Sequence, residues 1–231
     1  MKTILISIIS ITLITASTWQ GIQSSTQTLT SLEVQSGNLE LSIVEFNIDG
    51  FHLIPIQTPE GKMYLSHLED GASLLEASAP DMHKYARSIV IPDNKQMVIN
   101  ILSSDYIEYE NVLIAPSKGN LSRNIDPADV SFEFGSVYQE DTFFPGDLAG
   151  LESPYILRDI RGQSIVFYPF QYNPVQKVLR VYRNIEVEVY AAGPGQINVF
   201  NRTSAQPVYS KEFLNIYNNH FLNYSNDTRF D

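Results

Sequence analysis

Two strand-like segments joined by a short turn constrain the fold of this chain more than any other feature. Residues 163–172 and 178–190 carry apolar side chains at every second position, which is the repeat of a β-strand with one buried face. Asn173 and Pro174 lie between them, and proline is favoured where a turn needs a φ of about −65°. We therefore expect a β-hairpin over residues 163–190.

Shorter apolar runs elsewhere in the chain predict further strands. Residues 39–48, 87–91 and 97–112 are rich in Val, Ile, Leu and Tyr, which favour strands. Residues 52–57 form another run that contains Pro55. Because proline cannot donate a hydrogen bond to a neighbouring strand, this run indicates an edge strand.

The pattern near the C terminus changes from the strand repeat to helical spacing. Phe213, Tyr217, Phe221 and Tyr224 are three or four residues apart, and Ser210 is a suitable N-cap. The sequence therefore predicts a mainly β fold, a single antiparallel β-sandwich with a short C-terminal helix at residues 210–224.

The N terminus has the composition of a secretion signal. Lys2 precedes an apolar stretch at residues 4–16, and small residues follow at 16–18. That stretch is shorter than the roughly 20 apolar residues that cross a bilayer. We expect a signal peptide over 1–18 and a protein that is secreted, periplasmic or held at the cell surface. Residues 19–35, rich in Ser, Thr and Gln, predict a flexible leader before a domain over 36–228.

The composition argues against several classes of function. The formal net charge is −11, whereas nucleic-acid binding needs clustered cations, and no later segment is long and apolar enough to span a membrane. The chain has no cysteine, so it has neither disulfides nor a thiolate nucleophile. Its four histidines lack metal-ligand spacing, and no Gly-x-Ser-x-Gly motif is present. We expect a protein that is not an enzyme, with no metal and no cofactor.

Four uncommon sequence motifs occur in the same order as in a known family. They are VLIAPSKG at 112–119, FFPG at 143–146, ILRD at 156–159 with RGQ at 161–163, and QYNPV at 171–175. Together they resemble the N-terminal propeptide of the gingipain-type cysteine peptidases, most densely over residues 87–190. The match is weaker at residues 78–83, where the family's Gly-x-Pro-x-Leu-Pro pattern is altered.

The resemblance implies a fold, a function and a partner. The family's propeptide is a β-sandwich, in agreement with the strand pattern. The implied function is that of a secreted bacterial inhibitor and folding chaperone of a gingipain-like cysteine peptidase. Its partner would be the catalytic domain of that peptidase, on the same chain or on a separate one.

The resemblance also implies an inhibitory loop that follows the predicted strand at 97–112. Turn-forming residues place this loop at the surface, and Arg123 matches the family position that enters the specificity pocket as a pseudo-substrate. The alternative is that Arg123 is an ordinary solvated cation. The candidate loop residues are Lys118, Gly119, Leu121, Ser122, Arg123 and Asn124, and Lys118 is the nearer candidate for a Lys-specific partner.

Two other groups of charged residues are candidates for functional roles. Arg229, in the tail at 229–231, matches the basic residue after which the family is processed, although it could be an incidental terminal arginine. Arg158, Asp159 and Arg161 could form a charged interface, or Asp159 could pair locally or cap a turn.

A second class of function remains open from the sequence alone. The same scaffold could serve as a secreted binding or adhesion module that recognises a glycan or a peptide. Tyr106, Tyr109, Phe143 and Phe144 would then form an exposed aromatic face, although strand periodicity also fits ordinary core positions for such residues.

Overall fold

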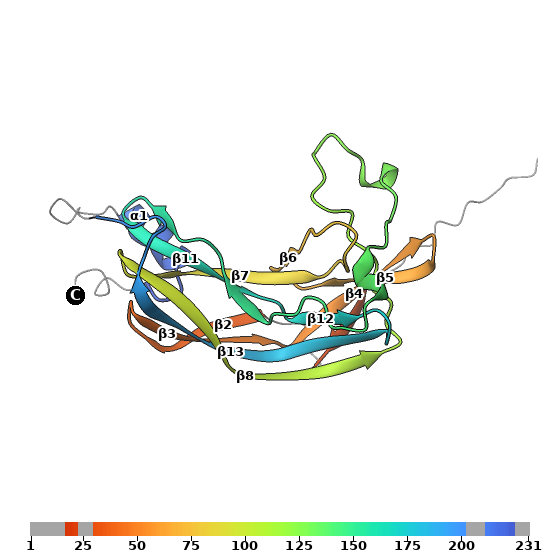
Figure 1. The fold of residues 1–231 in the computed structure, drawn as a ribbon, viewed down its shortest axis with the longest axis horizontal. Helices are drawn as coiled ribbons and strands as arrows, with labels where there is room; N and C mark the ends of the chain where they lie inside the picture. Colours follow the sequence, from red (N-terminus) through yellow and green to blue (C-terminus); the bar gives the residue numbers. More distant parts are fainter. Residues whose placement is uncertain (1–16, 23–29, 202–210, 225–231) are drawn as a thin grey trace, which may run out of the picture.

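Antiparallel β-strands form most of the computed structural model, which describes residues 17–22, 30–201 and 211–224 (Figure 1). Most of the expected signal peptide, the N-cap Ser210 and the processing residue Arg229 lie outside the described residues. In the part of the chain that is described, no helix has both the length and the apolar character needed to cross a membrane.

The first large sheet is built around the longest strand of the molecule. Its strands run in the order β12 (Phe170–Asn173), β13 (Val178–Pro194), β3 (Leu41–Ile48) and β2 (Thr30–Gly37). β12 and β3 pair with successive parts of one edge of β13, and β8 (Lys95–Glu110) pairs with its opposite edge. All of these pairings are antiparallel. The predicted strand at 97–112 is therefore confirmed as β8.

The second large sheet lies opposite the first. Its order is β10 (Tyr155–Leu157), β11 (Ile160–Phe167), β7 (His83–Val90) and β6 (Ala72–Ser73), and β9 (Ala149–Leu151) also pairs with β11. β7 extends the predicted strand at 87–91 toward the N terminus, because His83 to Ala86 also pair with β6 or β11.

A third, smaller sheet joins one end of the sandwich. β4 (Gly50–Thr58) lies in its middle, between β1 (Thr18–Gly21) and β5 (Gly61–His67). The prediction that residues 52–57 form an edge strand holds for residues 54–57, which pair only with β5 among the described residues, and is wrong for His52 and Leu53, which also pair with β1. Proline is tolerated there because β1 pairs only with the first four residues of β4, so Pro55 lies beyond it.

The core fills the space between the two large sheets. Phe46 of β3 stacks on Phe167 of β11, with ring centroids 5.0 Å apart and an interplanar angle of 12°. The other fully buried members come from both sheets, among them Val44, Ile48, Ile89, Ile165, Val181, Ile185, Val187 and Val189. Two facing sheets with one shared core confirm the predicted antiparallel sandwich.

The expected hairpin at 163–190 is correct in its turn but not in its first strand. The amide N of Gln176 donates to Asn173 Oδ1 at 3.0 Å, which closes the predicted turn before β13. However, the chain changes sheet at Tyr168 and Pro169, so β11 belongs to one sheet and β12 to the other. This crossing links the two layers covalently next to their shared core.

The described residues of the expected flexible leader form strands instead. Most of β1 and most of β2 lie within residues 19–35, which corrects the leader prediction. Trp19 packs on His52 with ring centroids 5.0 Å apart. Gly50 has no side chain and so leaves the space that the Trp19 indole occupies. Leu32 and Val34 of β2 pack against the core. Burial of these three apolar side chains outweighs the polar composition of the segment.

The C-terminal helix α1 spans Lys211–His220 and covers a second, smaller apolar cluster. Tyr217, Phe221 and Tyr224 pack there against Val90 and Ile160. The helix ends earlier than the predicted residue 224 because the amide N of Leu222 donates to Ser88 O at 2.9 Å, which draws the chain toward β7.

Arg161 of β11 is buried inside the fold, with 1% of its surface exposed. Its Nη1 donates to Pro92 O at 2.7 Å and Lys95 O at 2.6 Å, and its Nε and Nη2 donate to Asn198 O and Ile197 O at 2.8 and 2.9 Å. The side chain therefore ties β11 to the start of β8 and to the segment after β13. The interface role expected for Arg161 does not fit this burial.

We predict that Phe46→Ala lowers the free energy of unfolding by about 3–5 kcal/mol, because it removes a buried ring and leaves a cavity. Ile101→Ala on β8 is the control, since that side chain is 42% exposed, and it should cost about 1 kcal/mol or less. Urea denaturation at neutral pH measures both values. Similar losses for the two variants would contradict the assignment of the core.

We also predict that Arg161→Met lowers the free energy of unfolding by about 3 kcal/mol or more, because the four carbonyl groups bonded to this buried guanidinium lose their donor. Arg158→Met is the matched control, an exposed arginine whose guanidinium lies 3.9 Å from the Phe213 ring centroid. Its substitution should cost about 1 kcal/mol or less. An Arg161→Met protein as stable as the control would restore a surface role for Arg161.

Candidate functional site

A long loop projects from the sandwich, away from the first large sheet (Figure 1, green). It covers residues 118–134, which we call the projecting loop, and contains the 3-10 helix η1 (Pro127–Asp129). A second 3-10 helix, η2 (Ser136–Gln139), comes directly after it. The loop prediction at residues 118–129 therefore coincides with the most prominent protrusion of the fold.

Both ends of the projecting loop are fastened to one residue, Ser78. The amide N of Ser78 donates to Ser117 O, and the amide N of Gly135 donates to Ser78 O, each at 2.9 Å. Ser78 has a φ of +66°, in the left-handed region that residues other than glycine seldom adopt. A Cβ atom on Gly135 would lie 2.8 Å from Ser78 O, so glycine permits this close approach.

The segment that leads into the loop is bonded to the sandwich on both sides. Tyr64 of β5 donates from its amide N to Leu113 O and accepts from the amide N of Ala115, each at 2.8 Å. The Tyr138 hydroxyl donates to Ile114 O at 2.9 Å. Burial is the largest cause that raises the pKa of Tyr138, so this hydroxyl keeps its proton at ordinary pH. The loop therefore stands on an ordered base.

Lys118 stabilises the projecting loop through contacts with other residues of the loop. Its Nζ donates to Pro127 O at 2.7 Å and lies 4.1 Å from the centroid of the Phe132 ring. Gly119, with a φ of +76°, donates from its amide N to Ser117 Oγ at 3.1 Å. The ammonium of Lys118 thus has partners inside the loop, which does not favour it as the residue presented to a partner.

Arg123 lies at the tip of the projecting loop. The amide N of Ile125 donates to Ser122 O at 2.9 Å, so Arg123 and Asn124 are the central residues of a tight turn. All four residues of the turn are exposed. Among the described residues, the Arg123 guanidinium has no hydrogen-bond or ion-pair partner. The structure therefore presents this cation to any molecule that the loop contacts.

The six candidate loop residues divide into two groups. Lys118 and Gly119 lie at the base, where they shape the loop, whereas Ser122, Arg123 and Asn124 form its exposed tip. Leu121 lies between the groups and is half-buried. Sequence reasoning missed Ser78 and Gly135, because the bonds at the base join positions that are far apart in the chain.

Arg158 and Asp159 lie beside helix α1, at the opposite end of the molecule from the projecting loop (Figure 1). Asp159 is buried and accepts a 2.7 Å hydrogen bond from the Tyr217 hydroxyl. Arg158 is exposed and stacks on Phe213 of the helix. The three interface candidates therefore do not form one surface patch, since Arg161 and Asp159 are internal.

The aromatic residues considered for a binding face are engaged in packing. Arg180 lies between the rings of Tyr106 and Phe143, with centroid distances of 4.3 and 3.8 Å. Tyr109 and Phe144 pack against the main core. Tyr106 is 45% exposed, whereas the other three side chains are half-buried, so these four residues do not form one exposed aromatic face.

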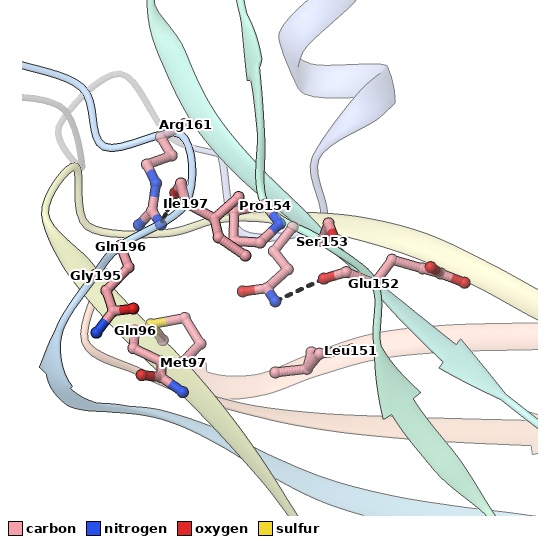
Figure 2. A pocket seen from close by; sticks show the side chains of 11 residues that line it. Gln96, Met97, Leu151, Glu152, Ser153, Pro154, Arg161, Gly195, Gln196 and Ile197 are labelled. Carbon is pink, nitrogen blue, oxygen red and sulfur yellow. Dashed lines mark hydrogen bonds between the residues drawn. The ribbon is translucent and has the colours of Figure 1, made fainter.

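A cavity of about 370 Å³ opens next to Arg161, between the start of β8 and residues 151–154 (Figure 2). Gln163 lines it, donates from Nε2 to Glu152 O at 2.7 Å, and has a buried Oε1 without a described partner. The described residues contain no group of three or more His, Cys, Asp or Glu side chains that could hold a metal. The residues that line the cavity lack the paired acid and base groups of a hydrolytic site.

Comparisons with known proteins place the chain in a family. The family model described as Propeptide_C25 matches residues 24–229. Gingipain R1 of Porphyromonas gingivalis is 37% identical over 186 residues, which are 79% of this chain and 19% of the relative. Lys-gingipain HG66 of the same species is 22% identical over 158 residues, which are 66% of this chain and 9% of the relative. The chain thus spans a minor part of each relative.

Two solved structures share the fold. One is a chain from the complex of Porphyromonas gingivalis RgpB pro- and mature domains, with a TM-score of 0.75, 36% identity, and coverage of 84% of this chain and 98% of that chain. The other comes from a study of the zymogenic latency of gingipain K of the same species, with a TM-score of 0.64, 22% identity, and coverage of 77% and 100%. These matches confirm the resemblance that the sequence motifs indicated. This chain belongs to the Propeptide_C25 family.

Proposed function

We propose that this chain is the inhibitory propeptide of a gingipain-like cysteine peptidase and binds the catalytic domain of that peptidase. The observation that carries the proposal is the projecting loop, which presents Arg123 at the tip of a closed turn on an ordered base. The family match supports the same role, as does the relative solved as a complex of pro- and mature domains.

The chemistry of Arg123 suits the specificity pocket of an Arg-specific peptidase. A guanidinium can pair with a pocket carboxylate through two parallel hydrogen bonds, out of water. The exposed tip can enter a groove without first breaking an internal contact, because Arg123 has no described partner to give up. We therefore assign it the role of a pseudo-substrate.

The bonds at the base of the loop support inhibition in two ways. They hold the tip in one shape before binding, which reduces the conformational entropy lost on association. They also join both sides of Arg123, since Lys118 precedes it and bonds to Pro127, which comes after it. After a cut at the tip, both ends would stay attached to the sandwich, so the cleft would remain filled.

The same binding would assist folding of the peptidase. A protein that binds the native catalytic domain but not its unfolded chain stabilises the native form by mass action. If both parts lie on one chain, the link supplies an effective concentration on the order of millimolar, so a modest affinity suffices. A separate inhibitor would need a well-packed interface of roughly 1,600 Å².

The two ends of the chain would serve export and processing. Residues 1–18 would act as the signal peptide that directs the protein out of the bacterial cytoplasm. Arg229 would be the site at which maturation separates the propeptide from the peptidase. The alternative function, glycan or peptide adhesion through exposed aromatic rings, has no supporting observation because the rings concerned pack against Arg180 or the core.

We predict that Arg123→Ala weakens inhibition of an Arg-specific gingipain-like peptidase by roughly 30-fold or more. Loss of one partner of a buried charge pair costs about 2–5 kcal/mol, and about 1.4 kcal/mol corresponds to a factor of ten. The inhibition constant is measured by titrating the isolated catalytic domain with folded protein. Arg123→Lys should recover part of the loss, because it restores the charge but not the bidentate geometry.

Arg183→Ala is the matched control for this titration. Arg183 lies on β13 in the sheet from which the loop points away, and it pairs with Asp105 at the surface. Such a pair contributes about 1 kcal/mol or less, so the fold and the inhibition constant should change little. Equal inhibition by the Arg123→Ala, Arg183→Ala and native proteins would remove Arg123 from the proposed role.

We predict that an Arg-specific protease trims the chain after Arg229 and that Arg229→Gln abolishes this cut. When the 231-residue chain is the substrate, this cut removes Phe230 and Asp231, so intact-mass spectrometry identifies the product. Arg87→Gln, which removes an exposed arginine of β7, is the control and should leave trimming unchanged. A native chain whose Arg229 bond stays intact even after denaturation would contradict the processing site.

A further inference from the structure

Three histidine rings from three different strands meet at one end of the sandwich. His52 of β4 and His67 of β5 are directly opposite each other across the small sheet, and their ring centroids are 6.1 Å apart. His83 of β7 packs on His67 with a centroid distance of 4.6 Å. We call these residues the histidine row. No local sequence pattern reveals it, since the three positions are widely spaced in the chain.

The histidine row is enclosed by side chains and backbone groups of the neighbouring strands. Trp19 packs on the far side of His52, and the Nδ1 atom of His52 is buried without a described hydrogen-bond partner. His83 Nδ1 lies 3.2 Å from the amide N of Leu68 and 3.1 Å from its carbonyl O, so it can accept from the first in the neutral form.

No carboxylate, that of Asp81 included, forms an ion pair with the histidine row among the described residues. Glu69 and Asp70 lie on the exposed turn after β5, and no ion pair joins either carboxylate to a described histidine. Lys84 follows His83 on β7, so strand alternation directs its side chain to the opposite face. Trp19 of β1 and Ser73, which pairs with His83 from β6, do not titrate.

The histidine row joins the two structures that support the projecting loop. β5 ends at His67, and its Tyr64 holds residues 113 and 115 by the paired 2.8 Å hydrogen bonds. His83 follows the segment 74–82, which is closed by the hydrogen bond from Leu74 N to Met82 O at 2.9 Å and carries Ser78. Repulsion between His67 and His83 would therefore separate the two supports of the loop.

We propose that the histidine row is a pH-sensitive latch, in which protonation at mildly acidic pH loosens the base of the projecting loop and weakens inhibition of the bound peptidase. The effect on inhibition rests on the proposed inhibitory function, whereas the loosening of the loop base does not. Like charges at the contact of β5 and β7 oppose the packing that holds the base.

The direction of the pH effect is set by His83. Burial is the largest cause that lowers its pKa below the ordinary value of 6.5, the charge of His67 lowers it further, and the bond to Leu68 acts in the opposite sense. The unfolded chain then binds the proton more readily than the folded chain. Stability is therefore fully present above about pH 6.5 and falls as the pH drops through and below that value.

The first experiment measures amide hydrogen exchange in the isolated protein at about pH 7.5 and about pH 5.5, with each rate corrected for its intrinsic value. Peptides that cover residues 62–67 and 112–117 should exchange at least about tenfold faster at the lower pH, relative to peptides from β13. In the His67→Gln/His83→Asn variant this acceleration should fall below about threefold. His220→Gln, on helix α1, is the matched control and should respond as the native protein does.

Two results would overturn the latch. Exchange at the base that does not depend on pH would do so, and so would an undiminished response in the double variant. The amide side chain introduced by His83→Asn can still accept a hydrogen bond from the amide N of Leu68, which favours folding of the variant. If the double variant does not fold at about pH 7.5, the single His67→Gln variant serves in its place.

The second experiment measures the inhibition constant of the native and double-variant proteins against the catalytic domain at both pH values. The native constant should rise at least about tenfold between about pH 7.5 and pH 5.5 relative to the variant. Equal pH dependence in the two proteins would contradict the regulatory role. Loosening without inhibition at either pH would instead refute the proposed function while leaving the latch in the fold.

Discussion

Burial of the facing apolar surfaces of the two large sheets is the interaction on which the other features depend. The chain has no cysteine, so no disulfide ties the layers together. Contacts such as the stack of Phe46 on Phe167 and the crossing of the chain at Tyr168 and Pro169 hold them instead. Because β3, β11 and β13 supply half of the buried residues of this core, they form a firm base to which the small sheet and the projecting loop are attached.

The projecting loop combines an exposed tip with an ordered base. A loop of this length without internal contacts would lose much conformational entropy on entering a groove. Here Ser78 joins the two ends, and Lys118 crosses the interior to Pro127. The turn at Ser122 to Ile125, closed by its own hydrogen bond, is the part that stays exposed to a partner. This division between a fixed base and an exposed tip is the physical basis of the proposed inhibition.

Much of the fold, but less of the site, could be predicted from the sequence. The strand at 178–190 was predictable because one face is buried along its length, which leaves a clear period of two. The change of sheet at Pro169 was not, since the apolar pattern continues through it. The internal role of Arg161 could not be predicted because its four carbonyl partners come from distant positions. Turn-forming residues revealed the loop, whereas Ser78 left no local signal.

The small sheet divides into a fixed strand and a more weakly held one. β4 contributes Phe51 and Leu53 to the main core, so it shares the stability of the sandwich. β5 has the buried Met63 but contributes only the half-buried Tyr64 to that core, and it is also the strand that bonds to the segment entering the loop. Local opening is cheapest where few apolar contacts are lost. A charge placed at the end of β5 would therefore act on the base of the loop before it disturbed the core, which explains how one region could respond to pH while the sandwich stays folded.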